Sequence, residues 1–355
     1  MNSDQYIFTP GPVKMAEEIL RLGAEQTPYF RNDAFSQVLL QCERDLLAAV
    51  NAPEGSRAVF LTASGTAGME AAVVNLLGAG DRAVVVDGGS FGRRFAEICE
   101  RHAIDHAVHA VHLDNLADPS ALAEYDATAL LINAHETSVG VLYDLDAVGR
   151  LCREKGWLNI VDAISMFVTD PLDMRAQHID ALIVSSHKGL ALPPGLSMVV
   201  LTPRAVGRLQ PPGMLYFDFR RYLEDGARGQ TPFTPAVTII LQLRYRLAQI
   251  RAEGIAAEQA KAAAVAAHFR QAVAPLPLRA YSPFMPNAMT TLSPTDGRSA
   301  YAVVEALEAH YNVVVAPSGG SLKETIFRVA HMGAVTEAYT DVLIDALFDY
   351  YGGKR

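Results

Sequence analysis

Apolar runs alternate with helix-like segments between about residues 58 and 202, and this alternation restricts the possible folds more than any other feature. The runs cover 58–61, 83–86, 106–111, 129–133, 158–163, 181–186 and 196–201. Continuous apolar runs are typical of strands that are buried on both faces of a sheet. Strands that alternate with helices usually pair in parallel. We therefore predict an α/β fold with a mainly parallel sheet in this part of the chain.

Polar or aromatic residues follow several predicted strands at the points where the strands end. Ligands of open α/β sheets bind beyond the carboxyl ends of the strands. Because these ends meet at one edge of a parallel sheet, we expect the residues that follow them to lie close together. They are Ser64, Phe91, Thr137, Asp162 and Lys188.

Lys188 differs from the other lysines because it follows the buried run 181–184. The chain contains six lysines, and none of the other five follows such a run. Burial lowers the pKa of an ammonium group, and the neutral amine can then attack a carbonyl carbon. The structural alternative is a lysine whose long side chain extends back to solvent.

The segment 64–66, Ser-Gly-Thr, joins a predicted strand to the start of a predicted helix. The free N–H groups of a helix N-terminus, with nearby hydroxyl groups, form a suitable site for an anion. The alternative is an ordinary loop in which a serine or threonine caps the helix. The segment fits neither the Walker A pattern nor G-x-G-x-x-G, so the sequence gives no direct support for nucleotide binding.

The composition disfavours several classes of partner. The formal net charge is −9 and no long basic run is present, which disfavours nucleic acid. No apolar stretch approaches the ~20 residues of a membrane span, and the first residues do not resemble a signal peptide. The three scattered cysteines have no metal-binding spacing. We expect a cytoplasmic protein with no membrane, nucleic-acid or metal partner.

The regular alternation ends near Arg204. A proline-fixed extended segment and two long predicted helices follow, and beyond them short strands and helices mix. We therefore predict an N-terminal arm with a large domain over 1–250 and a small α+β domain over 251–355. Arg328 alternates with apolar residues in a predicted strand. Such an arginine needs an anion, either a carboxylate side chain or a ligand.

Six motifs occur in the order and spacing of one enzyme family and span nearly the whole chain. They are Phe8–Pro12, Ser64–Thr66 followed by Met69–Ala71, His135–Gly140, Val161–Ala163, Ser185–Lys188 and Phe327–Arg328. With them the chain resembles the class V aminotransferases, in particular the alanine–glyoxylate, serine–pyruvate and 2-aminoethylphosphonate–pyruvate branch. The resemblance implies a pyridoxal-phosphate-dependent transferase of fold type I, with a mainly parallel seven-stranded sheet in the large domain.

The resemblance also implies how the site would hold pyridoxal 5′-phosphate (PLP). Lys188 would bond the cofactor and then move the proton at the substrate's α-carbon. Asp162 would pair with the pyridine nitrogen and keep it protonated. Phe91 would stack on the pyridine ring, where many relatives have tryptophan. Thr137 would form a hydrogen bond with the phenolic oxygen of the ring.

The implied phosphate contacts come from two subunits. Ser64, Gly65 and Thr66 would hold the phosphate at the helix start. His187 would lie nearby, where relatives often carry glutamine. The residues implied to reach the phosphate of the neighbouring subunit are Thr234 and either Gln230 or Thr231. The resemblance therefore implies a homodimer with a shared active site.

Three residues are expected at the substrate. The resemblance implies that Arg328 binds the substrate carboxylate through two hydrogen bonds. The alternative for Arg328 is a structural pair with a carboxylate side chain. Gly11 is expected beside the substrate, and Arg31, next to two aromatic residues in a predicted loop, is a candidate at the mouth of the site.

The expected reaction transfers an amino group from alanine, serine or 2-aminoethylphosphonate to pyruvate or glyoxylate. One alternative is a PLP-dependent lyase that acts on a small amino acid. Desulfurases of this fold usually need a cysteine in the C-terminal region, whereas the last cysteine here is Cys152. A non-catalytic relative is the third alternative, and the presence of both Lys188 and Asp162 argues against it.

Overall fold

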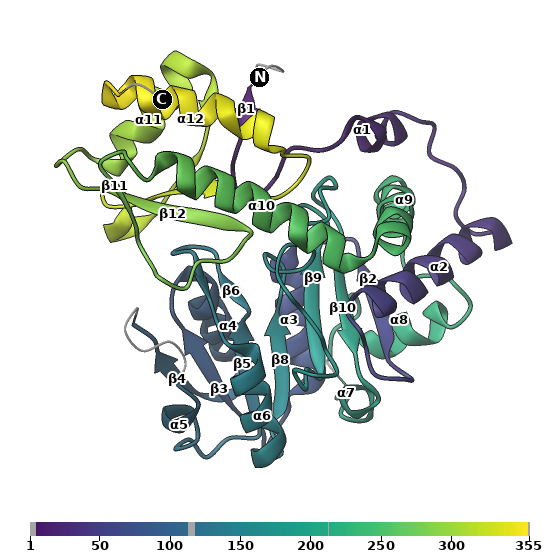
Figure 1. Ribbon diagram of the computed structural model, residues 1–355. Coiled ribbons are helices and arrows are strands. Elements are labelled where there is room, and N and C mark those ends of the chain that lie inside the picture. The colour runs from purple at the N-terminus through teal and green to yellow at the C-terminus, as the bar shows by residue number, and fades with distance from the viewer. Residues whose placement is uncertain (1–4, 113–117, 212, 354–355) are drawn as a thin grey trace.

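The core of the molecule is a seven-stranded sheet. The computed structural model describes residues 5–112, 118–211 and 213–353. The strands of this sheet are β2 (Arg57–Leu61), β3 (Arg82–Asp87), β4 (Asp105–Ala110), β5 (Ala129–Asn133), β8 (Leu158–Asp162), β9 (Ala181–Ser185) and β10 (Ser197–Leu201). They follow the order β2-β10-β9-β8-β5-β3-β4, and only β10 runs antiparallel to its neighbours (Figure 1). The predicted mainly parallel sheet is therefore confirmed.

Helices cover both faces of this sheet because its strands are apolar on both sides. In β3, Val84 and Val86 pack into one core and Val85 packs into the other, as the alternation of side chains along a strand requires. The first core includes residues of α2 (Asp33–Ala49), α6 (Leu145–Lys155) and α9 (Val237–Glu253). The second includes residues of α3 (Gly65–Leu76), α4 (Ser90–Arg101), α7 (Pro203–Gly207) and α8 (Phe219–Gly226).

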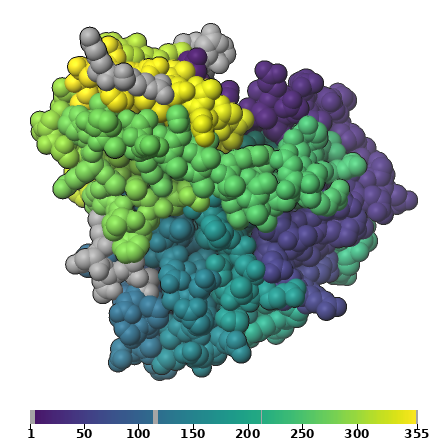
Figure 2. Space-filling model, in the orientation of Figure 1, coloured from purple at the N-terminus to yellow at the C-terminus, as the bar shows by residue number. Residues whose placement is uncertain are grey.

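A smaller antiparallel sheet forms in the C-terminal part of the chain. Its strands are β11 (Leu278–Ala280), β12 (Met289–Pro294), β14 (Ala316–Pro317) and β15 (Phe327–Ala330), in the order β11-β12-β15-β14. It packs with α10 (Ile255–Val273), α11 (Ala300–Tyr311) and α12 (Glu337–Tyr351). Figure 1 shows this part above the large sheet, and Figure 2 shows it seated on the teal surface. The division of the chain at residue 250 stays a prediction.

The N-terminal arm joins this smaller part rather than the large sheet. Its strand β1 (Tyr6–Ile7) pairs in parallel with β13 (Val313–Val314). Phe8 is buried in the same core as Phe327, and its carbonyl oxygen accepts a hydrogen bond from the N–H of Ala330. The arm therefore carries the residues after Phe8 to the junction between the two sheets.

Several short elements complete the two parts. They are α1 (Glu17–Gly23), α5 (Pro119–Leu122), the paired strands β6 (His135–Glu136) and β7 (Val141–Leu142), and a 3-10 turn at Gly320–Leu322. Within the described ranges, no helix is both long enough and apolar enough to cross a membrane.

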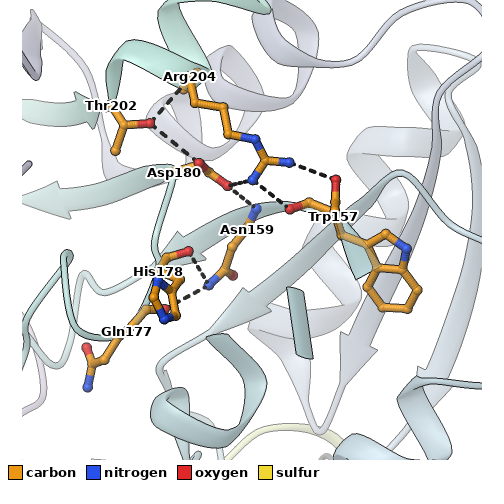
Figure 3. A network of polar contacts seen from close by, with 9 residues as sticks. Trp157, Asn159, Gln177, His178, Asp180, Thr202 and Arg204 are labelled. Carbon is orange, nitrogen blue, oxygen red and sulfur yellow. Dashed lines mark hydrogen bonds and ion pairs between the residues drawn. The ribbon is translucent and has the colours of Figure 1, made fainter. Parts of the chain in front are cut away.

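A polar network holds the edge of the large sheet that lies away from the carboxyl ends of the parallel strands (Figure 3). Asp180, just before β9, accepts a hydrogen bond from the N–H of Asn159 and pairs with Arg204, both at 2.9 Å. Arg204 also donates to the carbonyl oxygens of Trp157 and Gly156, which follow α6. Burial raises the pKa of Asp180, and these donors act against that shift. The network thus ties α6 to β8 and β9.

Candidate active site

A cavity of about 460 Å³ lies at the carboxyl edge of the large sheet. The predicted site residues that line it are Gly11, Phe91, Thr137, Lys188 and Arg328. They come from the N-terminal arm, α4, the turn after β6, the end of β9 and β15, which are far apart in the sequence. Residues of α11 close another side of the cavity. The fold thus brings together five of the residues that the sequence singled out.

Lys188 extends into this cavity from the segment after β9, with only 8% of its surface exposed. Burial lowers the pKa of its amine to about 8; the charge of Arg328 acts in the same direction and that of Asp162 in the opposite one. A fraction of the amine is therefore neutral near pH 7. Gly11 lies against this side chain, and a Cβ atom there would be 2.8 Å from Nζ. The φ angle of Gly11, +144°, also disfavours any other residue.

Asp162 is the last residue of β8 and is buried. Its carboxylate accepts hydrogen bonds from Asn133 Nδ2 at 2.7 Å and from the N–H of Ile164 at 2.9 Å. Burial raises the pKa of the carboxyl group to about 6, and these two hydrogen bonds oppose that shift. The carboxyl group is thus mainly ionised at pH 7, close enough to Lys188 for their charges to interact.

The N-terminus of α3 lies beside Asp162. A Cβ atom at Gly65 would lie 2.5 Å from Ile164 Cδ1, so the start of the helix touches the loop that follows Asp162. Ser64 is the N-cap residue, and its side chain makes no capping hydrogen bond. The exposed hydroxyl groups of Ser64 and Thr66 and the first N–H groups of α3 can therefore serve an anion.

His187 lies next to Lys188 and is partly buried. Its Nδ1 atom is 3.0 Å from the hydroxyl of Ser185. Burial lowers the pKa of its imidazole to about 4, and the charge of Lys188 contributes in the same direction. His187 is therefore neutral at pH 7 and can act as a hydrogen-bond partner rather than as a cation.

Phe91 and Thr137 form two further walls of the cavity. Phe91 lies in the first turn of α4, and the guanidinium of Arg94 packs 4.9 Å from the centre of its ring. Arg94 also donates to the hydroxyl of Thr66 at 3.3 Å. The hydroxyl of Thr137 donates to that of Ser165 at 2.7 Å. The aromatic face and the buried hydroxyl groups thus lie on elements that also contact the start of α3 and the loop after β8.

Arg328 enters the cavity from β15, and its hydrogen bonds leave one edge of the guanidinium free. Nη1 donates to the carbonyl oxygen of Thr137 at 3.1 Å and Nη2 to that of Pro317 at 2.6 Å. Nε is buried and has no hydrogen-bond partner among the described residues. Burial lowers the pKa of Arg328, and the charge of Glu136 opposes that shift. The Nε edge is suited to an anion that the chain itself does not supply.

A second cavity of about 780 Å³ adjoins the first, and Phe91 and Arg328 line both. Its wall includes Arg93, which pairs with Asp87 at 3.4 Å, and a loop of the smaller part around Ser321. The Lys188 cavity therefore has room beside it for the distal part of a ligand.

Three predicted site residues make their contacts in another part of the same chain. Arg31 donates to the carbonyl oxygen of Thr231 at 2.6 Å and to Gln230 at 3.2 Å. The Thr231 hydroxyl donates to the carbonyl oxygen of Phe233. Thr234 lines a separate, largely apolar groove of about 620 Å³. Arg31 and Thr231 are thus in contact, and Thr234 lies three residues further along the chain in a groove that Phe30 also lines.

Several polar residues of the site received no role from the sequence. Asn133 ends β5 and lies beside Asp162 in the parallel register, so the rule that polar residues follow buried strands could have found it. Ser165 meets Thr137 through folding of the loop after β8, and no local pattern indicates that contact. Glu136 is fully buried and accepts hydrogen bonds from the first turn of α4.

Comparisons with known proteins agree with this geometry. A family model described as Aminotransferase class-V matches residues 26–332. An L-aspartate–glyoxylate aminotransferase of Paracoccus denitrificans is 27% identical over 355 aligned residues, which cover 95% of this chain and 89% of the relative. A 2-aminoethylphosphonate–pyruvate transaminase of Pseudomonas fluorescens is 29% identical over 349 residues, covering 94% of this chain and 92% of the relative.

The fold agrees with a solved structure over nearly its whole length. The crystal structure of an aspartate aminotransferase of subgroup IV from Thermus thermophilus aligns with a TM-score of 0.91 and 29% sequence identity, covering 97% of this chain and 99% of that one. Since the family model also spans most of the chain, the protein belongs to the class V aminotransferases and is a pyridoxal-phosphate-dependent transaminase of fold type I.

Proposed function

We propose that this enzyme transfers an amino group from a small donor to pyruvate or glyoxylate. Alanine, serine and 2-aminoethylphosphonate are the candidate donors. The observation that carries the proposal is that Arg328, whose buried Nε has no hydrogen-bond partner among the described residues, lines the same cavity as Lys188. Pyruvate and glyoxylate both carry a carboxylate next to the carbonyl group that receives nitrogen, and an arginine edge binds a carboxylate through two parallel hydrogen bonds. The two relatives that use glyoxylate or pyruvate support this choice of acceptor.

The residues around the cavity fit PLP. The buried Lys188 amine, with its pKa lowered to about 8, suits the aldehyde group. The Asp162 carboxylate suits a protonated ring nitrogen, and the aromatic ring of Phe91 suits a flat heterocycle. At the start of α3, the uncapped N-terminus and the Ser64 hydroxyl suit a phosphate. We infer that these residues hold the cofactor, with Thr137 and His187 as further hydrogen-bond partners.

Each residue then has a defined chemical role. When bound, PLP supplies an electron sink for the electron pair left on the substrate's α-carbon. Nζ of Lys188 takes the proton from that carbon and returns a proton during transfer. Asp162, ionised at pH 7, keeps a proton on the ring nitrogen. Arg328 orients the substrate through its carboxylate, so that the α-hydrogen faces the amine.

The same arrangement favours an α-amino acid over an aminophosphonate as donor. An α-amino acid carries a carboxylate for Arg328, whereas 2-aminoethylphosphonate needs a site for a phosphonate. Arg93, a further cation that lines the adjoining cavity, is already paired with Asp87. We therefore rank alanine and serine ahead of 2-aminoethylphosphonate.

We also propose a homodimer in which the partner covers Arg31, Thr231 and Thr234. The groove beside these residues is lined mostly by apolar atoms, and its Tyr29 side chain is 69% exposed. Large exposed apolar surfaces commonly mark protein interfaces. In this arrangement the hydroxyl groups of Thr231 and Thr234 approach the phosphate of the other subunit.

The desulfurase alternative lacks a suitable thiol. Cys42, Cys99 and Cys152 are all buried, and burial raises the pKa of each thiol to about 12. A persulfide-forming cysteine needs an accessible thiolate. These cysteines therefore support a transaminase over a desulfurase.

The proposal is tested by an absorbance titration of the PLP-loaded enzyme with alanine, serine, aspartate and 2-aminoethylphosphonate in turn. We expect alanine or serine to shift the visible band of the bound cofactor. The cofactor extracted from the enzyme afterwards should be pyridoxamine phosphate. Conversion only by 2-aminoethylphosphonate would overturn the ranking of donors. A band that no donor converts would contradict the proposed substrate class.

A further inference from the structure

Glu136 is a buried carboxylate that forms no ion pair within the described part of the chain and accepts four hydrogen bonds instead. It accepts from the N–H groups of Gly92 at 2.9 Å and Phe91 at 3.4 Å, and from Ser138 through its N–H at 3.1 Å and its hydroxyl at 2.5 Å. An ionised carboxylate is costly to bury without such donors. Its position at the N-terminus of α4 adds the favourable end of the helix dipole.

This contact fixes where α4 begins. Gly89 is the N-cap residue, and it has no side chain that could satisfy the first N–H groups of the helix. Glu136 performs that function from a distant point of the sequence. The approach is so close that a Cβ atom at Gly89 would lie 2.7 Å from Cδ of Glu136. The N–H of Ser90 also donates to the Ser138 hydroxyl at 3.1 Å. The position of Phe91 therefore depends on Glu136.

Thr137 and Ser138, which follow Glu136, form hydrogen bonds with the smaller part of the molecule. The carbonyl oxygen of Thr137 accepts from Nη1 of Arg328 at 3.1 Å. That of Ser138 accepts from the hydroxyl of Ser318 at 3.2 Å. The turn 136–138 therefore contacts Phe91 on one side and Arg328 on the other, and both side chains line the Lys188 cavity.

We propose that Glu136 is a positioning residue that sets the ring of Phe91 and the guanidinium of Arg328 relative to each other. The inference rests on the proposed roles of these two residues toward the cofactor ring and the substrate carboxylate. Because the turn 136–138 contacts both side chains, a change in the position of the Phe91 ring also shifts the Arg328 guanidinium. Loss of the Glu136 contacts then weakens cofactor binding and substrate binding together.

The Glu136→Gln variant tests this coupling because it keeps the shape of the side chain. Its amide group turns one acceptor into a donor that faces an N–H group. In the cofactor-free protein, we expect amide exchange to accelerate at least about tenfold both in 88–95 and in 325–330. We further expect the dissociation constant for PLP to rise about tenfold and KM for pyruvate to rise about tenfold, with kcat changed by less than about threefold.

The matched control is Asp180→Asn, which alters another buried carboxylate at the opposite edge of the sheet. It is expected to leave the PLP dissociation constant unchanged and to speed exchange in 88–95 and 325–330 no more than in the other strands of the two sheets. Ser138→Ala removes one of the four hydrogen-bond donors to Glu136 and replaces Glu136→Gln if that variant does not fold. It should speed exchange in the same two segments and weaken PLP binding, each by about a third of the effect of Glu136→Gln.

Faster exchange in 88–95 alone, or unchanged exchange and PLP affinity in the variants at 136 and 138, would overturn the coupling. The same changes in Asp180→Asn would reduce Glu136 to a general structural role and overturn it as well. Exchange is measured on the cofactor-free protein, so it reports on the coupling even if the proposed reaction fails.

Discussion

The two edges of the large sheet contain similar buried polar residues, but these residues are satisfied in different ways. At one edge, Asp180 meets Arg204 at 2.9 Å, and this arginine also binds two carbonyl oxygens (Figure 3). At the other edge, Arg328 contacts only carbonyl oxygens through its Nη atoms, and its Nε has no partner among the described residues. A buried carboxylate that the chain pairs internally needs no ligand, whereas a buried guanidinium nitrogen without a partner in the chain is a candidate contact for one.

We call the edge of the large sheet at which Lys188, Asp162 and Arg328 lie the open edge. The largest expected effect comes from removing the Lys188 amine at this edge. Lys188→Ala should lower kcat at least about 1,000-fold, because the variant has no group to bond the cofactor or to move the α-proton. Stopped-flow and steady-state assays with PLP-loaded protein measure the loss. Lys155→Ala, whose amine contacts the carbonyl oxygen of Ala123 at the surface, is the control and should retain activity. Retained turnover in Lys188→Ala would place the chemistry elsewhere.

The buried carboxylate at the open edge should also be visible in the pH dependence of stability. The pKa of Asp162 is about 6 in the folded chain, above its ordinary value of 3.8, so the folded state binds more protons than the unfolded state between about pH 4 and 6. The contribution of Asp162 to stability therefore falls as pH rises through this window. Relative to the wild type, cofactor-free Asp162→Asn should gain about 2 kcal/mol from pH 4 to pH 6.

Urea unfolding of both cofactor-free proteins at several pH values measures that difference. If the difference in free energy of unfolding between the two proteins stays constant between pH 4 and pH 6, the pKa of Asp162 is not raised by burial.

A smaller effect is expected from changing the shape of the cation at the open edge. Arg328→Lys keeps the charge but loses the two-pronged edge, so KM for pyruvate should rise about 30-fold, equivalent to about 2 kcal/mol. The affinity for PLP should stay within about twofold. Arg93→Lys, which alters an exposed arginine paired with Asp87, is the control and should leave KM nearly unchanged. An equal rise of KM in both variants would show that Arg328 does not bind the substrate carboxylate.

At the internally paired edge, a substitution should affect stability and leave catalysis intact. Asp180→Asn removes the negative partner of Arg204, whose side chain is 47% exposed, and weakens the buried contact with the N–H of Asn159, so the free energy of unfolding should fall by about 1 kcal/mol. Because this edge lies away from the Lys188 cavity, kcat and KM should remain within about twofold. Denaturant unfolding and steady-state kinetics on the same preparation measure both quantities. A large loss of kcat with intact folding would show that the two edges are not independent.

The sequence predicted those site residues that follow an apolar run in the chain. Lys188 and Asp162 each follow a buried apolar run, and the parallel sheet places their strand ends at one edge. The start of α4 at Ser90 could not be read from its own residues. Its capping group, Glu136, lies in another strand, and a contact of that kind leaves no signal in the residues next to the helix.

The position of Arg31 could not be predicted for a similar reason. Its partners Gln230 and Thr231 lie about 200 residues away in the chain, and the aromatic neighbours of Arg31 fit a ligand site and a subunit contact equally well. The N-terminal arm also gave no indication that its strand would pair with β13, which is what brings Gly11 to Lys188. Contacts between distant segments therefore account for most of what the sequence did not reveal.

The most direct test of the central claim is to map the lysine that bonds the cofactor. The PLP-loaded enzyme is reduced with borohydride, digested and analysed by mass spectrometry. Of the six lysines in the chain, we predict that only Lys188 carries the phosphopyridoxyl group. A modification on any other lysine, or none on Lys188 in protein that has bound PLP, would contradict the assignment of the open edge as the active site.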